Sequence, residues 1–167
     1  MRNLVALTLI LAALAFSACQ TSPRQPAASA PLIARFYLET KPNEVAVTVR
    51  LPQSGISLNV APKPVFSEYD ISTADIARVE LGLCVLVKLT PAATRDFYRL
   101  SVPAQGRRLV LSLNDVFLGV HRIERAMADG VVPVFLEVRD DQLPELVKQL
   151  KNTSSDLARV VQKNNNQ

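Results

Sequence analysis

Residues 83–102 read LCVLVKLTPAATRDFYRLSV, and within this stretch the hydrophobic pattern changes from that of a strand to that of a helix. The segment 83–89 is apolar on both faces, which is typical of an internal strand. Thr90 and Pro91 then stand where helices prefer their N-cap and their first residue. A buried helical face is predicted by three apolar residues at helical spacing: Ala93, Phe97 and Leu100. The stretch therefore predicts a strand that leads directly into an amphipathic helix.

The segments that flank this stretch read mostly as strands. IARVEL (76–81) precedes it, and RRLVLSLNDVFLGVHRIE (107–124) follows it as two strands joined by a turn at Asn114-Asp115. VVPVFLEV (131–138) is expected to form the next strand, and Pro133 predicts that this strand lies at an edge or a bulge.

A second helix is expected near the C-terminus. Asp140 or Asp141 is its predicted N-cap. Its apolar stripe consists of Leu143, Leu146, Val147 and Leu150. The order of strands and helices predicts an α+β fold, with a mostly antiparallel sheet and two helices packed on one face in the ferredoxin-like manner. Residues 153–167 are expected to form a polar C-terminal tail.

A β-rich region is predicted to precede this domain, over residues 32–64. LIARFYLE (32–39) and VAVTVRL (45–51) both alternate, and the turn-rich TKPNE between them predicts a hairpin. ISLNV (56–60) alternates again, and the prolines that follow it suggest an edge strand or a crossover.

The first 31 residues resemble a bacterial lipoprotein leader. Residues 1–18 have a positive start, an apolar run and a small-residue ending, which is the layout of a secretory signal. The run is about 20 Å long as a helix, too short for a permanent span of the bilayer. Cys19 follows Ser17-Ala18 as the lipidated cysteine follows a lipobox, although Phe16 replaces the usual Leu. Residues 19–31 are expected to form a lipidated, flexible tether. Gln20, directly after the cysteine, resembles a sorting signal for the outer membrane.

A second resemblance covers residues 65–152, which are similar to the head subdomain of the first periplasmic domain of SecD/SecDF, an accessory subunit of the protein-export translocase. It rests on Ile71 and Asp75-Ile76-Ala77, on Leu89-Thr90 before the helix, and on the strand and turn from Gly106 to Asp115. The turn is Asn-Asp here instead of Asp-Gly, and we expect no counterpart of the six membrane spans or of the base subdomain. The resemblance implies contact with emerging polypeptide, without the proton-driven motor of the membrane part.

The sequence contains no catalytic motif, so we expect a protein that is not an enzyme and that has no cofactor or metal. The single histidine, His121, is predicted to be a surface or hydrogen-bonded strand residue. Cys84 lies in an apolar strand and is predicted to be a small buried hydrophobe. Arg107 and Arg108 are the best candidates for contact with an anion or a partner.

Composition and compartment together exclude nucleic acid as the expected partner, because the formal net charge of +4 is small and scattered. We expect a membrane-anchored envelope protein that binds a protein partner or an unfolded secretory polypeptide. The alternative is a structural subunit of an envelope complex without an export role. Polypeptide binding by strand addition needs a free sheet edge beside an apolar groove, and the candidate strands are 56–60 and the strand that contains Pro133.

Overall fold

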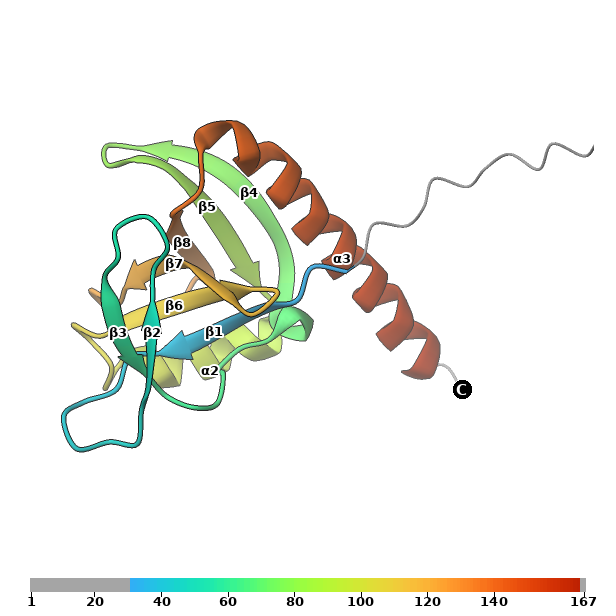
Figure 1. Cartoon of the computed structure of the whole chain (residues 1–167). Coiled ribbons are helices and arrows are strands. Elements are labelled where there is room, and N and C mark those ends of the chain that lie inside the picture. The colour runs from blue at the N-terminus through green and yellow to red at the C-terminus, as the bar shows by residue number, and fades with distance from the viewer. Residues whose placement is uncertain (1–30, 166–167) are drawn as a thin grey trace, which may run out of the picture.

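The computed structural model describes residues 31–165, which form a six-stranded antiparallel sheet, a two-stranded sheet and two α-helices (Figure 1). The strands of the large sheet are β1 (Ala34–Leu38), β4 (Ile71–Val79), β5 (Gly82–Leu89), β6 (Arg108–Leu113), β7 (Val116–Arg122) and β8 (Val131–Leu136). The small sheet consists of β2 (Val47–Arg50) and β3 (Ser57–Val60). The helices are α2 (Pro91–Ser101) and α3 (Leu143–Asn165), and short 3₁₀ turns are present at η2 (Glu68–Asp70) and η3 (Asp140–Gln142).

The large sheet has the strand order β1-β6-β7-β8-β5-β4, and every neighbouring pair is antiparallel. The predicted turn between β6 and β7 is confirmed, because Asn114 and Asp115 both adopt positive φ, at 47° and 64°. Two successive residues with positive φ characterise the two-residue turns that fit the twist of a hairpin. The predicted start of α2 is confirmed as well: the Thr90 side chain accepts a hydrogen bond from the backbone N–H of Ala93, and Pro91 is the first helical residue.

The main core lies between the large sheet and both helices, as the predicted α+β fold class requires. Ala93 and Phe97 of α2 are buried in this core. From α3, Leu143, Val147 and Leu150 join the same cluster. The sheet contributes alternate residues, such as Leu109 and Leu111 of β6, whereas Val110 between them belongs to the opposite face. The two helices therefore cover one face of the sheet.

The opposite face of the sheet is covered in part by the β2–β3 hairpin. Val49, Leu51, Leu58 and Val60 pack there against Val110 in a second, smaller core. The predicted hairpin between residues 32–39 and 45–51 is wrong: β1 pairs with β6, and β2 pairs with β3. The reason is that the buried side chains of β1 belong to the main core, whereas β2 contributes only Val49 and lies on the other face of the sheet.

The prediction that the strand with Pro133 lies at an edge or a bulge is also wrong, because β8 lies inside the sheet between β7 and β5 and its pairing has no register shift at Pro133. In the β5–β8 ladder, Pro133 and Leu86 form a non-hydrogen-bonded pair. The backbone nitrogen of Pro133 therefore points toward β7. The β7–β8 pairing covers only Gly119–Leu136 and Val120–Phe135, and it stops before Pro133. An internal proline is tolerated because the ladder ends where its N–H would be needed.

The C-terminal helix is longer than predicted. Residues 153–165 continue α3 instead of forming a separate polar tail. Thr153 and Ser154 are buried, and the Thr153 hydroxyl accepts a hydrogen bond of 2.9 Å from the backbone N–H of Leu32. Contact with the start of the domain thus extends the helix. The predicted cap is different too: a 3₁₀ turn precedes α3, and the Asp141 carboxylate pairs with Arg139 at 2.9 Å.

Candidate functional site: a free strand edge beside an apolar groove

The outer edge of β4 is open over its second half. The β4–β5 hairpin closes with the pair Val79–Gly82 around a two-residue turn, so hydrogen-bonded pairs alternate along the ladder from that point. By this alternation, the backbone N–H and C=O groups of Ile76 and Arg78 point away from β5. Among residues 31–165, no group forms a hydrogen bond with them. Figure 1 shows this long hairpin extending past the rest of the sheet, with α3 beside β4. We call the backbone of residues 76–79 the β4 edge.

A groove of about 400 Å³ lies beside the β4 edge, between β4 and the first half of α3. Its apolar walls are Ile76, Pro144 and Val147, and its polar lining is Lys148, Lys151 and Asn152. Ile76 is 38% exposed, and Val79 and Leu81 are exposed further along the hairpin. We call the cavity lined by Ile76 and by these five residues of α3 the β4–α3 groove. It places apolar side chains next to unpaired backbone groups.

The other end of β4 is closed. Lys151 of α3 forms an ion pair with Asp75, and the neighbouring Ala74 is fully buried. A register shift between Ile71 and Thr73 interrupts the regular ladder there. An added strand therefore has access to the hairpin end of β4 only.

The opposite edge strand of the large sheet, β1, is covered by the chain itself. The Phe36 N–H donates to the carbonyl of Phe66 at 2.8 Å, and the Val65 N–H donates to the carbonyl of Phe36 at 2.7 Å. The Ala61 N–H donates to the carbonyl of Leu38 at 2.9 Å. Residues 61–66 thus occupy the outer side of β1 at Phe36 and Leu38.

The strands that the sequence suggested for strand addition do not provide the site. β8 has neighbours on both sides, and β3 pairs with β2 while its end reaches β1 through the Glu39–Val60 bridge. By the alternation of its ladder, β2 has free backbone groups at Thr48 and Arg50, and the cavity that adjoins it at Leu51 is smaller, about 230 Å³, and lies between the hairpin and the large sheet. Among the outer edges of the two sheets within residues 31–165, the β4 edge is thus the one whose free backbone lies beside the β4–α3 groove.

Arg107 and Arg108 are engaged by the protein's own carboxylates. Arg108 binds Glu39 through two side-chain nitrogens and through its backbone N–H, and Arg107 lies 3.1 Å from Glu44. The hydrogen bond from Arg108 lowers the pKa of the Glu39 carboxyl below its usual range. An external anion would have to displace these carboxylates. The pair therefore joins β1 to β6 and is a weaker candidate for partner contact than the β4 edge.

His121 and Cys84 have the roles that the sequence predicts. The Nδ1 atom of His121 lies 2.9 Å from the carbonyl of Pro133, which makes His121 a hydrogen-bonded strand residue, and burial lowers its pKa. A cavity of about 590 Å³ borders it where β7 and β8 separate. Cys84 is 1% exposed, and burial raises the pKa of its thiol.

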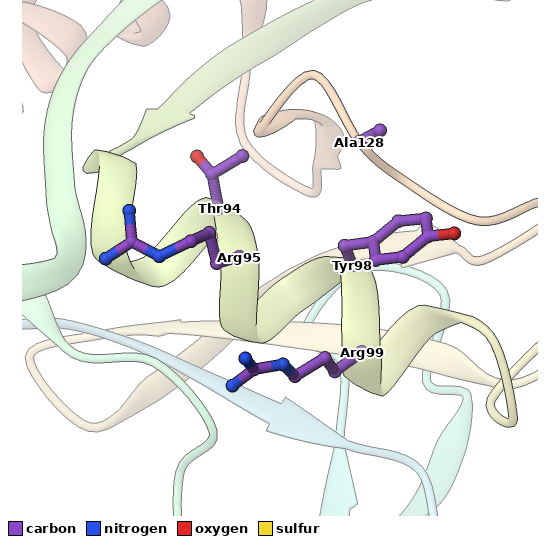
Figure 2. Close-up of a pocket in the computed structure, with 5 residues that line it drawn as sticks. All are labelled: Thr94, Arg95, Tyr98, Arg99 and Ala128. Carbon is purple, nitrogen blue, oxygen red and sulfur yellow. The ribbon is translucent and has the colours of Figure 1, made fainter.

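Figure 2 shows a shallow pocket of about 360 Å³ on the exposed side of α2. Thr94 and Tyr98 point toward the loop that carries Ala128, whereas the guanidinium groups of Arg95 and Arg99 extend away from it. The Arg99 side chain is 78% exposed and lies 3.5 Å from Asp96. The pocket is basic and open, and no buried polar group points into it, so it resembles a solvated helix surface.

No group of three or more His, Cys, Asp or Glu residues in 31–165 has the geometry to hold a metal ion. No helix in this part of the chain is both long enough and apolar enough to cross a membrane. Cys19 and the predicted signal and tether lie outside the described residues.

The sequence predicted Val147 only as part of the apolar stripe of its helix, and it did not indicate the polar groove residues of α3. Lys148 and Lys151 look like ordinary solvated lysines of an amphipathic helix, and Asp75-Ile76 stood out only through the resemblance to SecD/SecDF. These residues form a site only because α3 lies beside β4, and no local sequence pattern specifies that arrangement.

Comparison with known proteins gives a likeness in structure alone. No protein-family model matches the sequence, and no curated protein sequence matches it. A solved structure of SecDF, described as a membrane component that enhances protein export, matches 72% of this chain with a TM-score of 0.53 and 17% identity. A structure of SecDF in a super-membrane-facing form matches 71% with a TM-score of 0.54 and 17% identity. This chain spans 62% of the first of those chains and 18% of the second. In fold, the chain thus resembles the head-like domain of SecDF.

Proposed function

We propose that this protein is a non-catalytic envelope lipoprotein that binds extended polypeptide by strand addition at the β4 edge, in a role related to protein export or chaperoning. The observation that carries this proposal is the unpaired backbone of Ile76 and Arg78 beside the β4–α3 groove. The likeness to SecDF in fold supports the export-related part of the proposal. In this account Cys19 is lipidated and the domain faces the periplasm, with the outer membrane as the favoured address.

Strand addition fits the chemistry of an unfolded client. Backbone hydrogen bonds are independent of sequence, so a free edge binds many extended chains, and pockets beside it favour certain side chains. Ile76 and Arg78 together offer two N–H donors and two C=O acceptors. At roughly 0.5–1.5 kcal/mol for each net hydrogen bond, and against the cost of ordering the client, such an edge gives weak and reversible binding. Reversible binding is what a protein that handles passing polypeptides needs.

An open edge also carries a risk of aggregation, which the molecule limits. Charged side chains on edge strands discourage pairing between copies of the same chain. Asp75 and Arg78 stand on β4, and the Asp75–Lys151 pair closes one end of the strand. Only residues 76–79 remain open, which is enough for a short extended segment but not for a long sheet-to-sheet contact.

The proposal is tested by Ile76→Pro in the full chain, purified in detergent. Proline removes an N–H that points outward, so the β4–β5 ladder keeps its hydrogen bonds, as at other edge positions. Binding of a fluorescent, reduced and alkylated polypeptide, which cannot refold, is measured by anisotropy. We expect binding about tenfold weaker, since a lost hydrogen bond and a blocked approach together cost about 1.4 kcal/mol.

Two variants serve as controls. Ile76→Val keeps the backbone donor, and Thr48→Pro places the same change on the other open edge, at β2; both are expected to bind like the wild type. A correctly folded Ile76→Pro variant with unchanged binding would overturn the proposal, as would a loss caused equally by Thr48→Pro.

A further inference from the structure

The charged side chains that line the β4–α3 groove are both basic. Lys151 is neutralised by Asp75, whereas Lys148 is 71% exposed and its nearest carboxylate, Glu145, is 4.0 Å away. Arg78, on the β4 edge itself, is exposed and forms no ion pair within residues 31–165. A client on the β4 edge thus meets Lys148, whose ion pair with Glu145 is long and exposed, and Arg78, which has no ion pair within residues 31–165.

The pleat of an added strand decides which client side chains meet these groups. Side chains on neighbouring strands lie opposite one another on the same face, and the chain alternates between faces with a period of two. Ile76 faces the helices, because its partner Val85 belongs to the main core. A client side chain opposite Ile76 therefore points into the groove, toward Pro144 and Val147, and so does the client residue two positions away.

From this geometry we infer that the β4–α3 groove selects extended segments in which an apolar residue stands two positions from an acidic residue. The apolar side chain contacts Ile76, Pro144 and Val147, and the carboxylate lies near the ammonium group of Lys148. This inference rests on the proposed function and names the class of polypeptide that the same site prefers. Basic segments are disfavoured, because they would place like charges against Lys148.

The expected selectivity is modest and depends on salt. Ion pairs between exposed side chains contribute little, so we expect a segment with Glu at this position to bind about two- to fivefold more tightly than the same segment with Gln. A segment with Lys is expected to bind more weakly than the Gln form by a similar factor. Raising the ionic strength from 0.05 to about 0.5 M should bring the three affinities together, because the screening length falls well below 10 Å.

The test uses three synthetic peptides of alternating pattern that differ only in having Glu, Gln or Lys two positions from the central apolar residue. Their affinities for the full chain are measured by fluorescence anisotropy, and the measurement is repeated with Lys148→Glu. We expect the order Glu, Gln, Lys for the wild type and the loss of this order for the variant, in which the new carboxylate offsets the charge of Arg78. Lys163→Glu makes the same charge change in the last turn of α3, outside the groove, and should leave the wild-type order intact.

The outcomes separate this inference from the proposed function. Equal affinities for all three peptides, or an order that Lys148→Glu does not change, would overturn the charge selectivity while the Gln peptide still reports strand addition. If Lys163→Glu changes the order of the peptide affinities as Lys148→Glu does, the cause is a long-range effect of net charge. That result would also overturn the inference. If no peptide binds, including the Gln form, the proposed function fails and the inference fails with it.

Discussion

The two outer strands of the large sheet differ in whether their outward backbone groups are hydrogen-bonded. On β1, residues 61–66 bind the outward backbone groups of Phe36 and the carbonyl of Leu38, and Phe66 packs edge-on against Phe36 and Phe97 with ring centroids 6.4 and 5.4 Å apart. On β4, the backbone of Ile76 and Arg78 has no partner within residues 31–165, and apolar side chains beside it are exposed. Because this chain closes one edge with its own segment, the open edge is a distinct feature of the domain and not a general property of its sheet.

The largest expected effect comes from breaking the closed edge with Phe66→Ala. Phe66 is 5% exposed and connects the cover of β1 to the helix layer, so its truncation should lower the free energy of unfolding by about 3–5 kcal/mol. Urea unfolding followed by circular dichroism measures the change.

Tyr69→Ala is the matched control for this prediction. Tyr69 is 61% exposed on the adjoining η2 turn, and we expect a change within about 0.5 kcal/mol. A loss below 1 kcal/mol for Phe66→Ala would mean that the cover of β1 contributes little to the fold, and the contrast between the two edges would lose its basis.

A smaller effect is expected where β1 is joined to β6 by the Arg108–Glu39 pair. Arg108→Gln should cost roughly 1 kcal/mol at pH 7, because the pair is only partly buried. The folded state lowers the pKa of Glu39, so the pair stabilises the protein above the unfolded value of about 4.3. This contribution disappears as the pH falls through the lower pKa of the folded state. The difference in unfolding free energy between the wild type and Arg108→Gln should therefore shrink below about pH 4.

Urea midpoints between pH 3 and pH 7 check this prediction. Arg139→Gln breaks an exposed ion pair with Asp141 in the same turn and should change the midpoint little at any pH. A difference for Arg108→Gln that stays constant down to pH 3 would contradict the role given to the Glu39 charge.

The elements that local chemistry specifies were predictable from the sequence. The cap at Thr90 and Pro91, the turn at Asn114-Asp115 and the buried stripe of α2 each depend on residues within a few positions of one another. The fold class followed from the order of these elements, with two helices on one face of an antiparallel sheet.

Pairing between distant segments was not predictable in the same way. The alternation of 32–39 and 45–51 suggested a hairpin, but β1 pairs with a strand about 75 residues away because its buried side chains belong to the main core. Pro133 suggested an edge, since nothing local shows that the β7–β8 ladder ends beside it. The β4–α3 groove depends on contacts between residues about 70 positions apart, so Lys148 and Ile76 had no shared signal in the sequence.

The measurement that tests the central claim most directly is amide hydrogen exchange of the full chain, residue by residue, with and without the reduced and alkylated polypeptide. In the free protein, we predict slow exchange at Phe36, whose N–H is bonded to Phe66, and fast exchange at Ile76 and Arg78. Saturating polypeptide should slow exchange at Ile76 and Arg78 while leaving Phe36 and the β2 edge unchanged. Bound polypeptide that leaves the amides of Ile76 and Arg78 fast, or that protects the β2 edge instead, would contradict the account.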